Sequence, residues 1–234
     1  MLFISELFCA VAGLIGPAIA ILVYAFQVKK GWKWILSGAA CYVVLELIIR
    51  LPILTLLNAD PVTGSYLSSN PYLYAAFMAG TAAILGIGAR WLITKILLGW
   101  NDTNTVAIGF GLGFGGIEAA LVAGVSWFLT AFSGAPAAAG LTWDIPFWAG
   151  VERISILLFQ IIWTMMTVES VREKKPLLFW AALIFNFGVI FTATCAASIW
   201  KWPVWLMEIL MLVPAVWLSW VMIPKGLKED AKRK

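Results

Sequence analysis

The feature that most constrains this chain is a series of seven apolar runs, each long enough to cross a lipid bilayer as a helix. A membrane-spanning helix needs about 20 mostly apolar residues, and the runs that qualify are 3–28, 32–57, 72–98, 104–132, 145–169, 177–199 and 203–223. They are much longer than the roughly 10-residue alternating strands of a membrane barrel. The sequence therefore predicts an all-α, polytopic membrane bundle of about seven transmembrane helices.

Composition supports a membrane protein and excludes other classes. Of the 234 residues, 62% are hydrophobic and 12% are charged, whereas soluble domains carry about 25% charged residues. A soluble fold of this length could not bury so much apolar surface. A net charge of +4 is compatible with a nucleic-acid ligand, but the basic residues form short clusters between the apolar runs. We therefore expect contact with the lipid bilayer and no binding of nucleic acid.

The positions of lysine and arginine predict the orientation. Outside the spans, nearly all of them fall in one set of loops and in the tail, and only Lys201 falls in the alternate loops, which include 58–71 and 133–144. Cytoplasmic loops carry the excess of basic residues. We therefore predict the N-terminus outside and the C-terminus in the cytoplasm, with one transmembrane domain, 1–224, and a basic cytoplasmic tail, 225–234. The expected location is the cytoplasmic membrane.

Several ionisable side chains lie inside the predicted spans, where they are costly and usually mark a function. They are Glu46, Arg50, Arg90, Glu118, Glu152, Arg153 and Glu208. Glu46 and Arg50 are one helical turn apart and are predicted to pair; one role for such a pair is only to hold the bundle together. Gln160 and Asn186 lie at mid-depth in spans five and six, so each amide needs a partner on another helix.

Span four contains a glycine-rich segment, which reads Gly-Phe-Gly-Leu-Gly-Phe-Gly-Gly-Ile-Glu over residues 109–118. Glycine in a helix costs up to about 1 kcal/mol relative to alanine, so the presence of several glycines in this segment requires an explanation. Close helix packing is one reason, and a break that exposes the backbone to a cavity is another. We favour a polar cavity with Glu118 at its floor, lined or braced by Arg50, Arg90, Glu152, Arg153, Gln160 and Asn186.

These motifs resemble the YhfC family of intramembrane metalloproteases over nearly the whole chain. The similar segments are Leu45–Leu54, Gly88–Trp91, Gly111–Glu118, Glu152–Arg153 with Gln160 after them, and Trp205–Glu208. The resemblance implies a seven-helix bundle that cleaves substrates within the bilayer by means of a metal ion held by histidines.

The residues that the resemblance would place at the metal are absent. The chain contains no histidine, and the positions where the family pattern has one hold Phe114, Gln160 and Asn186. The family's pair of glutamates before the span-three arginine is replaced by Gly86 and Ile87. A catalytic zinc needs about three protein ligands, and only scattered carboxylates and three cysteines on different segments remain. We therefore predict no metal site and no cofactor.

Three functions remain open on the sequence alone. The first is a catalytically inactive relative of these proteases, an accessory or regulatory subunit whose cavity binds a transmembrane helix, a lipid-like molecule or a partner membrane protein. The second is an active protease that depends on Glu118, the one catalytic candidate. The third is a small transporter or channel component in which the buried charges form a substrate or proton path. The missing metal ligands favour the first.

Overall fold

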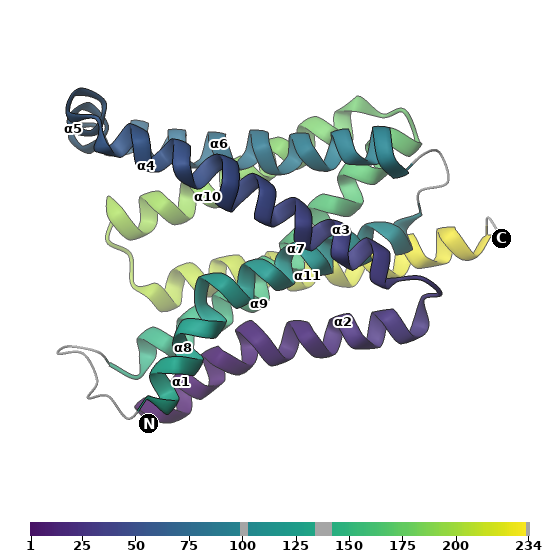
Figure 1. Ribbon diagram of the computed structural model, residues 1–234, viewed down its shortest axis with the longest axis horizontal. Helices are drawn as coiled ribbons and strands as arrows, with labels where there is room; N and C mark the ends of the chain where they lie inside the picture. Colours follow the sequence, from purple (N-terminus) through teal and green to yellow (C-terminus); the bar gives the residue numbers. More distant parts are fainter. Residues whose placement is uncertain (99–102, 134–141, 233–234) are drawn as a thin grey trace.

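The computed structural model describes residues 1–98, 103–133 and 142–232, and in these residues every regular element is a helix (Figure 1). The helices long and apolar enough to cross a membrane are Leu2–Gln27, Trp32–Ala59, Pro71–Ile96, Asn104–Phe132, Asp144–Arg172, Pro176–Ser198 and Val204–Lys232. The predicted seven-helix membrane bundle is therefore confirmed. The two chain ends lie at opposite ends of the bundle (Figure 1), as an odd number of crossings requires. Which end faces the cytoplasm stays a prediction.

Spans one, two and four are interrupted by short π-helical segments and the described part of span three ends in one, whereas the last three spans are continuous α-helices. The elements are α1 Leu2–Ala10, η1 Val11–Ile15, α2 Gly16–Gln27, α3 Trp32–Tyr42, η2 Val43–Arg50, α4 Leu51–Ala59, α5 Pro61–Ser69, α6 Pro71–Ile93, η3 Thr94–Leu98, α7 Asn104–Ala119, η4 Ala120–Gly124, α8 Val125–Phe132, α9 Asp144–Arg172, α10 Pro176–Ser198 and α11 Val204–Lys232. Such π segments are rare and occur preferentially at functional sites.

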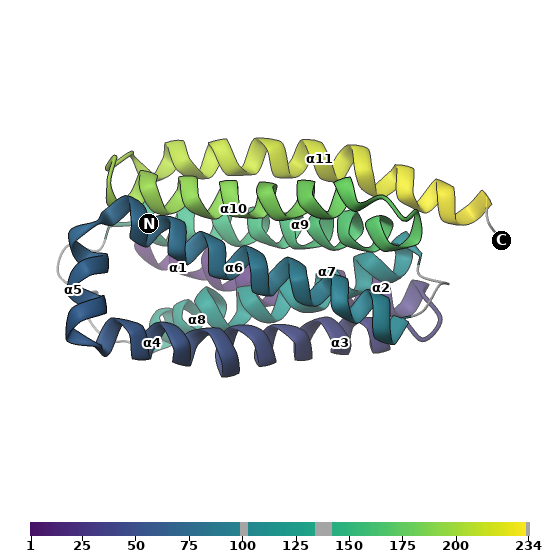
Figure 2. The ribbon, with the colours of Figure 1, turned by 90° about the horizontal axis from the view of Figure 1, so that it is seen from above.

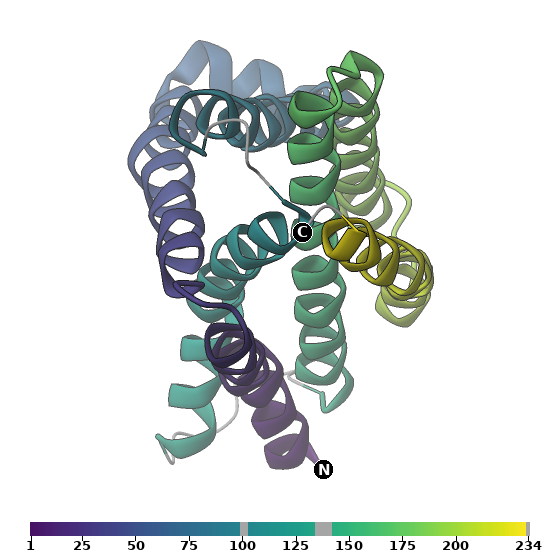
Figure 3. The same cartoon turned by 90° about the vertical axis from the view of Figure 1, so that its right-hand side faces the viewer.

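Helix α7 is the central helix of the bundle, with α3 on one side and α9 on the other (Figure 3). The glycines of the 109–118 segment make this packing possible. A Cβ atom added at Gly113 would collide with the carbonyl oxygen of Ile35 on α3, and one added at Gly111 would come within 2.6 Å of the Ile161 Cα on α9. The glycines are therefore needed for the close approach of α7 to both neighbours. A cavity beside Glu118 is not the only explanation for them.

Span two leaves the centre of the bundle as it proceeds. Its α3 half packs on α7 through Gly38, where a Cβ atom would meet the Phe110 carbonyl oxygen. Beyond η2, α4 runs along one edge of the bundle, α5 turns at its end, and α6 returns (Figure 2). The predicted loop 58–71 is thus largely the helix α5. It begins because the Asp60 carboxylate accepts a hydrogen bond of 2.7 Å from the Thr63 N–H, a normal N-cap. Most of the predicted loop 133–144 lies outside the described residues.

The last helix extends well past its predicted end at residue 223. Helix α11 continues through Pro224 to Lys232, so the described part of the predicted tail is helical and continuous with span seven. Its buried residues there are Gly226 and Asp230. The Asp230 carboxylate accepts hydrogen bonds from the backbone N–H groups of Asn104 and Thr105, at 3.1 and 2.8 Å. The end of α11 therefore caps the beginning of α7. That this segment is cytoplasmic stays a prediction.

Candidate functional site

A polar cavity of about 340 Å³ lies where spans two to six meet, with Met211 of α11 at its wall. All seven residues predicted from the sequence to line or brace a cavity do line it: Arg50, Arg90, Glu118, Glu152, Arg153, Gln160 and Asn186. Tyr42 and Glu46 contribute from span two. The structure thus brings the predicted residues together, and their role in binding stays a prediction.

Arg90 of α6 is held by α7 and α9 and is only 2% exposed. Its Nε donates a hydrogen bond of 3.1 Å to the Thr164 Oγ1, and its Nη2 donates to the Gln160 Oε1. The guanidinium also lies over the Phe114 ring, with its Cζ 3.9 Å from the ring centroid. Cation–π contacts of this kind strengthen when they are desolvated. Arg90 is therefore fixed in place without direct contact to any carboxylate in the described part of the chain.

Gln160 connects this arginine to the carboxylate of the glycine-rich helix. Its Oε1 accepts from Arg90, and its Nε2 donates to the Glu118 Oε2. A hydrogen-bonded chain therefore runs from α6 through α9 to α7. Both polar atoms of the buried amide are used, as buried polar groups require. Any new ligand of Glu118 would have to share it with, or displace, the Gln160 amide.

Arg50 and Glu46 form the ion pair that their spacing predicts, with 2.7 Å between the Arg50 Nη1 and the Glu46 Oε2. Sequence reasoning missed the other partners of Arg50, which both come from α6. Its Nε donates to the Thr81 Oγ1 at 3.1 Å, and its Nη2 donates to the Met78 carbonyl oxygen at 2.9 Å. No signal in one sequence orients span two toward α6, so these partners could not be found from spacing.

Two residues that line the cavity each carry a buried polar atom without a hydrogen-bond partner among the described residues. Arg153, 5% exposed, pairs with the adjacent Glu152, but its Nε has no hydrogen-bond acceptor. Asn186, 3% exposed, has no donor to its Oδ1. Buried groups without partners are uncommon and call for an explanation. The residues that line the cavity therefore include one donor and one acceptor without a partner.

The positions at which the resemblance expects histidines meet at this cavity. Phe114, Gln160 and Asn186 all line it, and so does Gly86, whereas Ile87 is buried in the apolar core with Phe159 and Trp163. A phenyl ring offers no lone pair to a metal ion, and both polar atoms of Gln160 are engaged. Within the described residues, no group of three or more His, Cys, Asp or Glu side chains could hold a metal ion. The residues present do not fit a catalytic zinc.

Comparison with known protein families gives a match. A family model described as YhfC intramembrane metalloprotease matches residues 15–212. The matched segment contains every lining residue of the polar cavity. No curated protein and no solved structure gives a significant match.

Proposed function

Since the chain belongs to the YhfC intramembrane metalloprotease family, we propose that it is a member that binds within the membrane and has lost metal-dependent cleavage. In this proposal it is an accessory or regulatory subunit. Its polar cavity holds a transmembrane helix, a lipid-like molecule or part of a partner membrane protein.

The observation that carries the proposal is the meeting of Phe114, Gln160 and Asn186 at one cavity. In a relative with histidine at all three positions, the three imidazoles would line one cavity, and a catalytic zinc takes about three such protein ligands. Here they are a phenyl ring and two amides. The family's cavity is kept while its donor set is lost, and this supports binding over cleavage.

The surroundings of Glu118 also support binding over a protease that depends on this carboxylate. A general base must reach the water or nucleophile that it activates. The Glu118 Oε2 already accepts from the Gln160 amide, which is itself held by Arg90. This chain positions the carboxylate as part of a structural network that spans three helices.

Two measurements test the proposal. The first is the metal content of the purified protein by elemental mass spectrometry, where we expect far less than one zinc per chain. The second is photo-crosslinking in native membranes from a benzoylphenylalanine placed at Val122, which lines the cavity and is 54% exposed. The matched control is the same residue at Leu121, which is 45% exposed and lies outside the lining.

We expect a discrete adduct from Val122 that is lost in the Arg153→Leu variant and is absent from Leu121. Near-stoichiometric zinc, or cleavage of a membrane substrate that Glu118→Gln abolishes, would show an active protease instead. Solute uptake into proteoliposomes by the chain alone would favour the transporter.

A further inference from the structure

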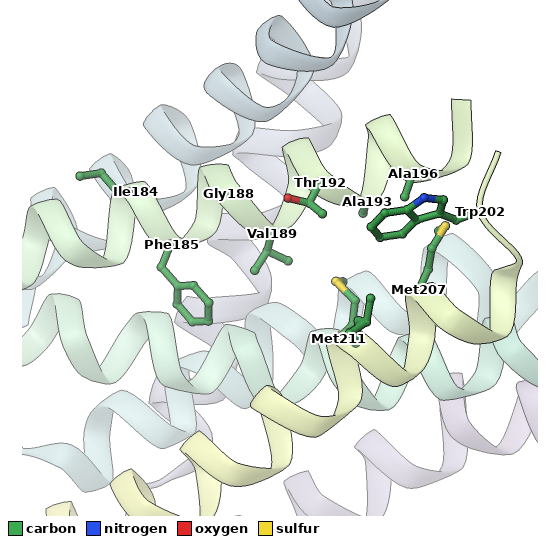
Figure 4. Close-up of a pocket in the computed structure, with 11 residues that line it drawn as sticks. Ile184, Phe185, Gly188, Val189, Thr192, Ala193, Ala196, Trp202, Met207 and Met211 are labelled. Atoms are coloured by element: carbon green, nitrogen blue, oxygen red, sulfur yellow. The ribbon is translucent and has the colours of Figure 1, made fainter. Parts of the chain in front are cut away.

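A second, apolar groove of about 330 Å³ lies between α10 and α11. Phe185, Val189 and Met211 point into the space between the two helices, and the Trp202 indole lies at the other end beside Met207 (Figure 4). No charged residue occurs in its described lining. The groove is reached from the lipid side, because its lining residues Ile184 and Leu210 are 65% and 54% exposed.

The groove and the polar cavity share a wall. Val189, Ala193 and Met211 line both of them. Ala193 has the smallest side chain of the three. An apolar space open to lipid and a polar space inside the bundle are therefore adjacent, which is the arrangement that an amphiphilic ligand requires.

The charges of the cavity argue for an uncharged head group. Its lining holds three arginines and three glutamates. Arg50 pairs with Glu46 and Arg153 pairs with Glu152, while Arg90 and Glu118 are joined through Gln160. An added ion would lose its hydration without gaining an uncompensated partner. The charge balance therefore disfavours both anionic and cationic ligands.

The two partnerless atoms specify the hydrogen bonds of that head group. The Arg153 Nε needs an acceptor and the Asn186 Oδ1 needs a donor, and both side chains are more than nine-tenths buried. A ligand that supplies both groups would remove the cost of leaving them unpaired. A hydroxyl-bearing ester or a primary amide supplies both.

We propose that the groove and the cavity together form one site for a single-chain amphiphile with an uncharged head that both accepts and donates hydrogen bonds. Monoacylglycerols and fatty amides belong to this class. The apolar chain lies between α10 and α11, and the head reaches past Ala193 to Arg153 and Asn186. This inference rests on the proposed binding function and specifies its ligand.

The test uses the full chain in detergent, with monoolein as the probe and native mass spectrometry as the readout. We expect one saturable monoolein per chain, and weaker binding of oleate and oleylamine, which have the same chain length and charged heads. Ala193→Trp, at the shared wall, is expected to weaken monoolein binding at least about tenfold, a loss of about 1.4 kcal/mol. Asn186→Leu, which removes the free acceptor, is expected to do the same.

The matched control is Ala197→Trp, which introduces the same side chain on an exposed face of the same helix, outside both linings, and should leave binding unchanged. Equal weakening by Ala197→Trp, equal affinity for the charged amphiphiles, or no saturable monoolein binding would each overturn the ligand assignment. These outcomes are separate from failure of the proposed function. If Val122 gives an adduct that depends on Arg153 but monoolein does not bind, only the ligand assignment is wrong. Stoichiometric zinc would instead contradict the proposed binding function itself.

Discussion

The Cζ atom of Arg90 lies 3.9 Å from the centroid of the Phe114 ring, and this contact joins the span-three arginine to a position where the family resemblance expects a metal ligand. The same guanidinium donates to Gln160, at a second such position. One buried cation therefore holds two of the replaced side chains in place. In the proposed binding member of the family, this contact would hold the walls of the cavity in place without a metal ion.

Restoring the three histidines should restore metal binding. Phe114, Gln160 and Asn186 line one cavity, so the triple variant Phe114→His, Gln160→His and Asn186→His supplies the three ligands that a catalytic zinc needs. We expect close to one zinc per chain by elemental mass spectrometry, against little in the unmodified protein. The double variant that keeps Gln160 is the control and should retain less zinc. A monodisperse triple variant without zinc would refute the shared site.

Loss of the Arg90 side chain should destabilise the bundle. The Arg90→Met variant keeps an apolar side chain of similar length but leaves the Gln160 Oε1 without its donor and removes the contact with Phe114. Hydrogen bonds to charged groups contribute about 1.5–3 kcal/mol each, so we expect the free energy of unfolding in detergent to fall by about 3 kcal/mol. Arg90→Lys should recover only part of the lost free energy of unfolding, because an ammonium lacks the planar arrangement of N–H donors of a guanidinium. Unchanged thermal stability of Arg90→Met would be the contrary result.

The same glycine-to-alanine change should have opposite effects at two positions. At Gly113 the added methyl would meet the Ile35 backbone, which cannot move aside without separating α3 from α7. We expect Gly113→Ala to lower the free energy of unfolding by about 1–3 kcal/mol. At Gly88 nothing lies within 4 Å of the added atom, so Gly88→Ala should stabilise α6 by up to about 1 kcal/mol. Equal changes of melting temperature in the two variants would contradict the close contact between α3 and α7 at Gly113.

The contact between α11 and α7 should depend on one carboxylate. Asp230 accepts from the backbone N–H groups of Asn104 and Thr105 and from the Thr105 hydroxyl. Replacing an N-cap carboxylate with alanine costs about 0.5–2 kcal/mol, and we expect Asp230→Ala to make residues 225–232 susceptible to limited proteolysis. Glu229→Ala is the control. Glu229 is half-exposed and lies 3.7 Å from Arg172, a contact expected to contribute little. Similar cleavage of both variants would contradict the cap.

Helix α5 should respond to acid. The backbone N–H of Thr63 donates to the Asp60 carboxylate and holds its pKa below the ordinary value. A carboxyl group whose pKa is lowered in the folded state stabilises that state above its unfolded pKa, and the stabilisation is lost as the pH falls through the folded value. Amide exchange at Thr63 and Gly64, corrected for intrinsic rates, should therefore rise as the pH falls below about 4. In Asp60→Asn, amide exchange at these residues should not rise in acid. If it does not rise in the native protein either, Asp60 does not cap α5.

The spans and the membership of the cavity could be predicted because each has a local signature. A bilayer-length apolar run identifies a span whatever surrounds it, and a charge such as Arg90 or Glu118 at mid-depth must face the protein interior. The seven cavity residues therefore met as expected from their chemical type and depth alone. The Glu46–Arg50 pair followed from one helical turn of spacing.

The remaining features depend on how helices face one another, which a single sequence does not encode locally. The apolar run predicted an end to span seven at residue 223, yet α11 continues to Lys232, where Asp230 accepts hydrogen bonds from the start of α7. The partners of Arg50 on α6 have the same origin. The helix α5 was different, because Asp60 followed by Pro61 is a start signal that could have been recognised.

The cap on α7 also has a consequence for biogenesis. Asn104 and Asp230 are 126 residues apart in sequence, so the central helix is threaded into the bilayer long before the carboxylate that completes its first turn has been synthesised. Until the ribosome has passed residue 230, the start of α7 must rely on water or on lipid head groups for its hydrogen bonds. The hydrogen bonds from the Asn104 and Thr105 N–H groups to Asp230 can therefore form only after nearly all of the last helix has been synthesised.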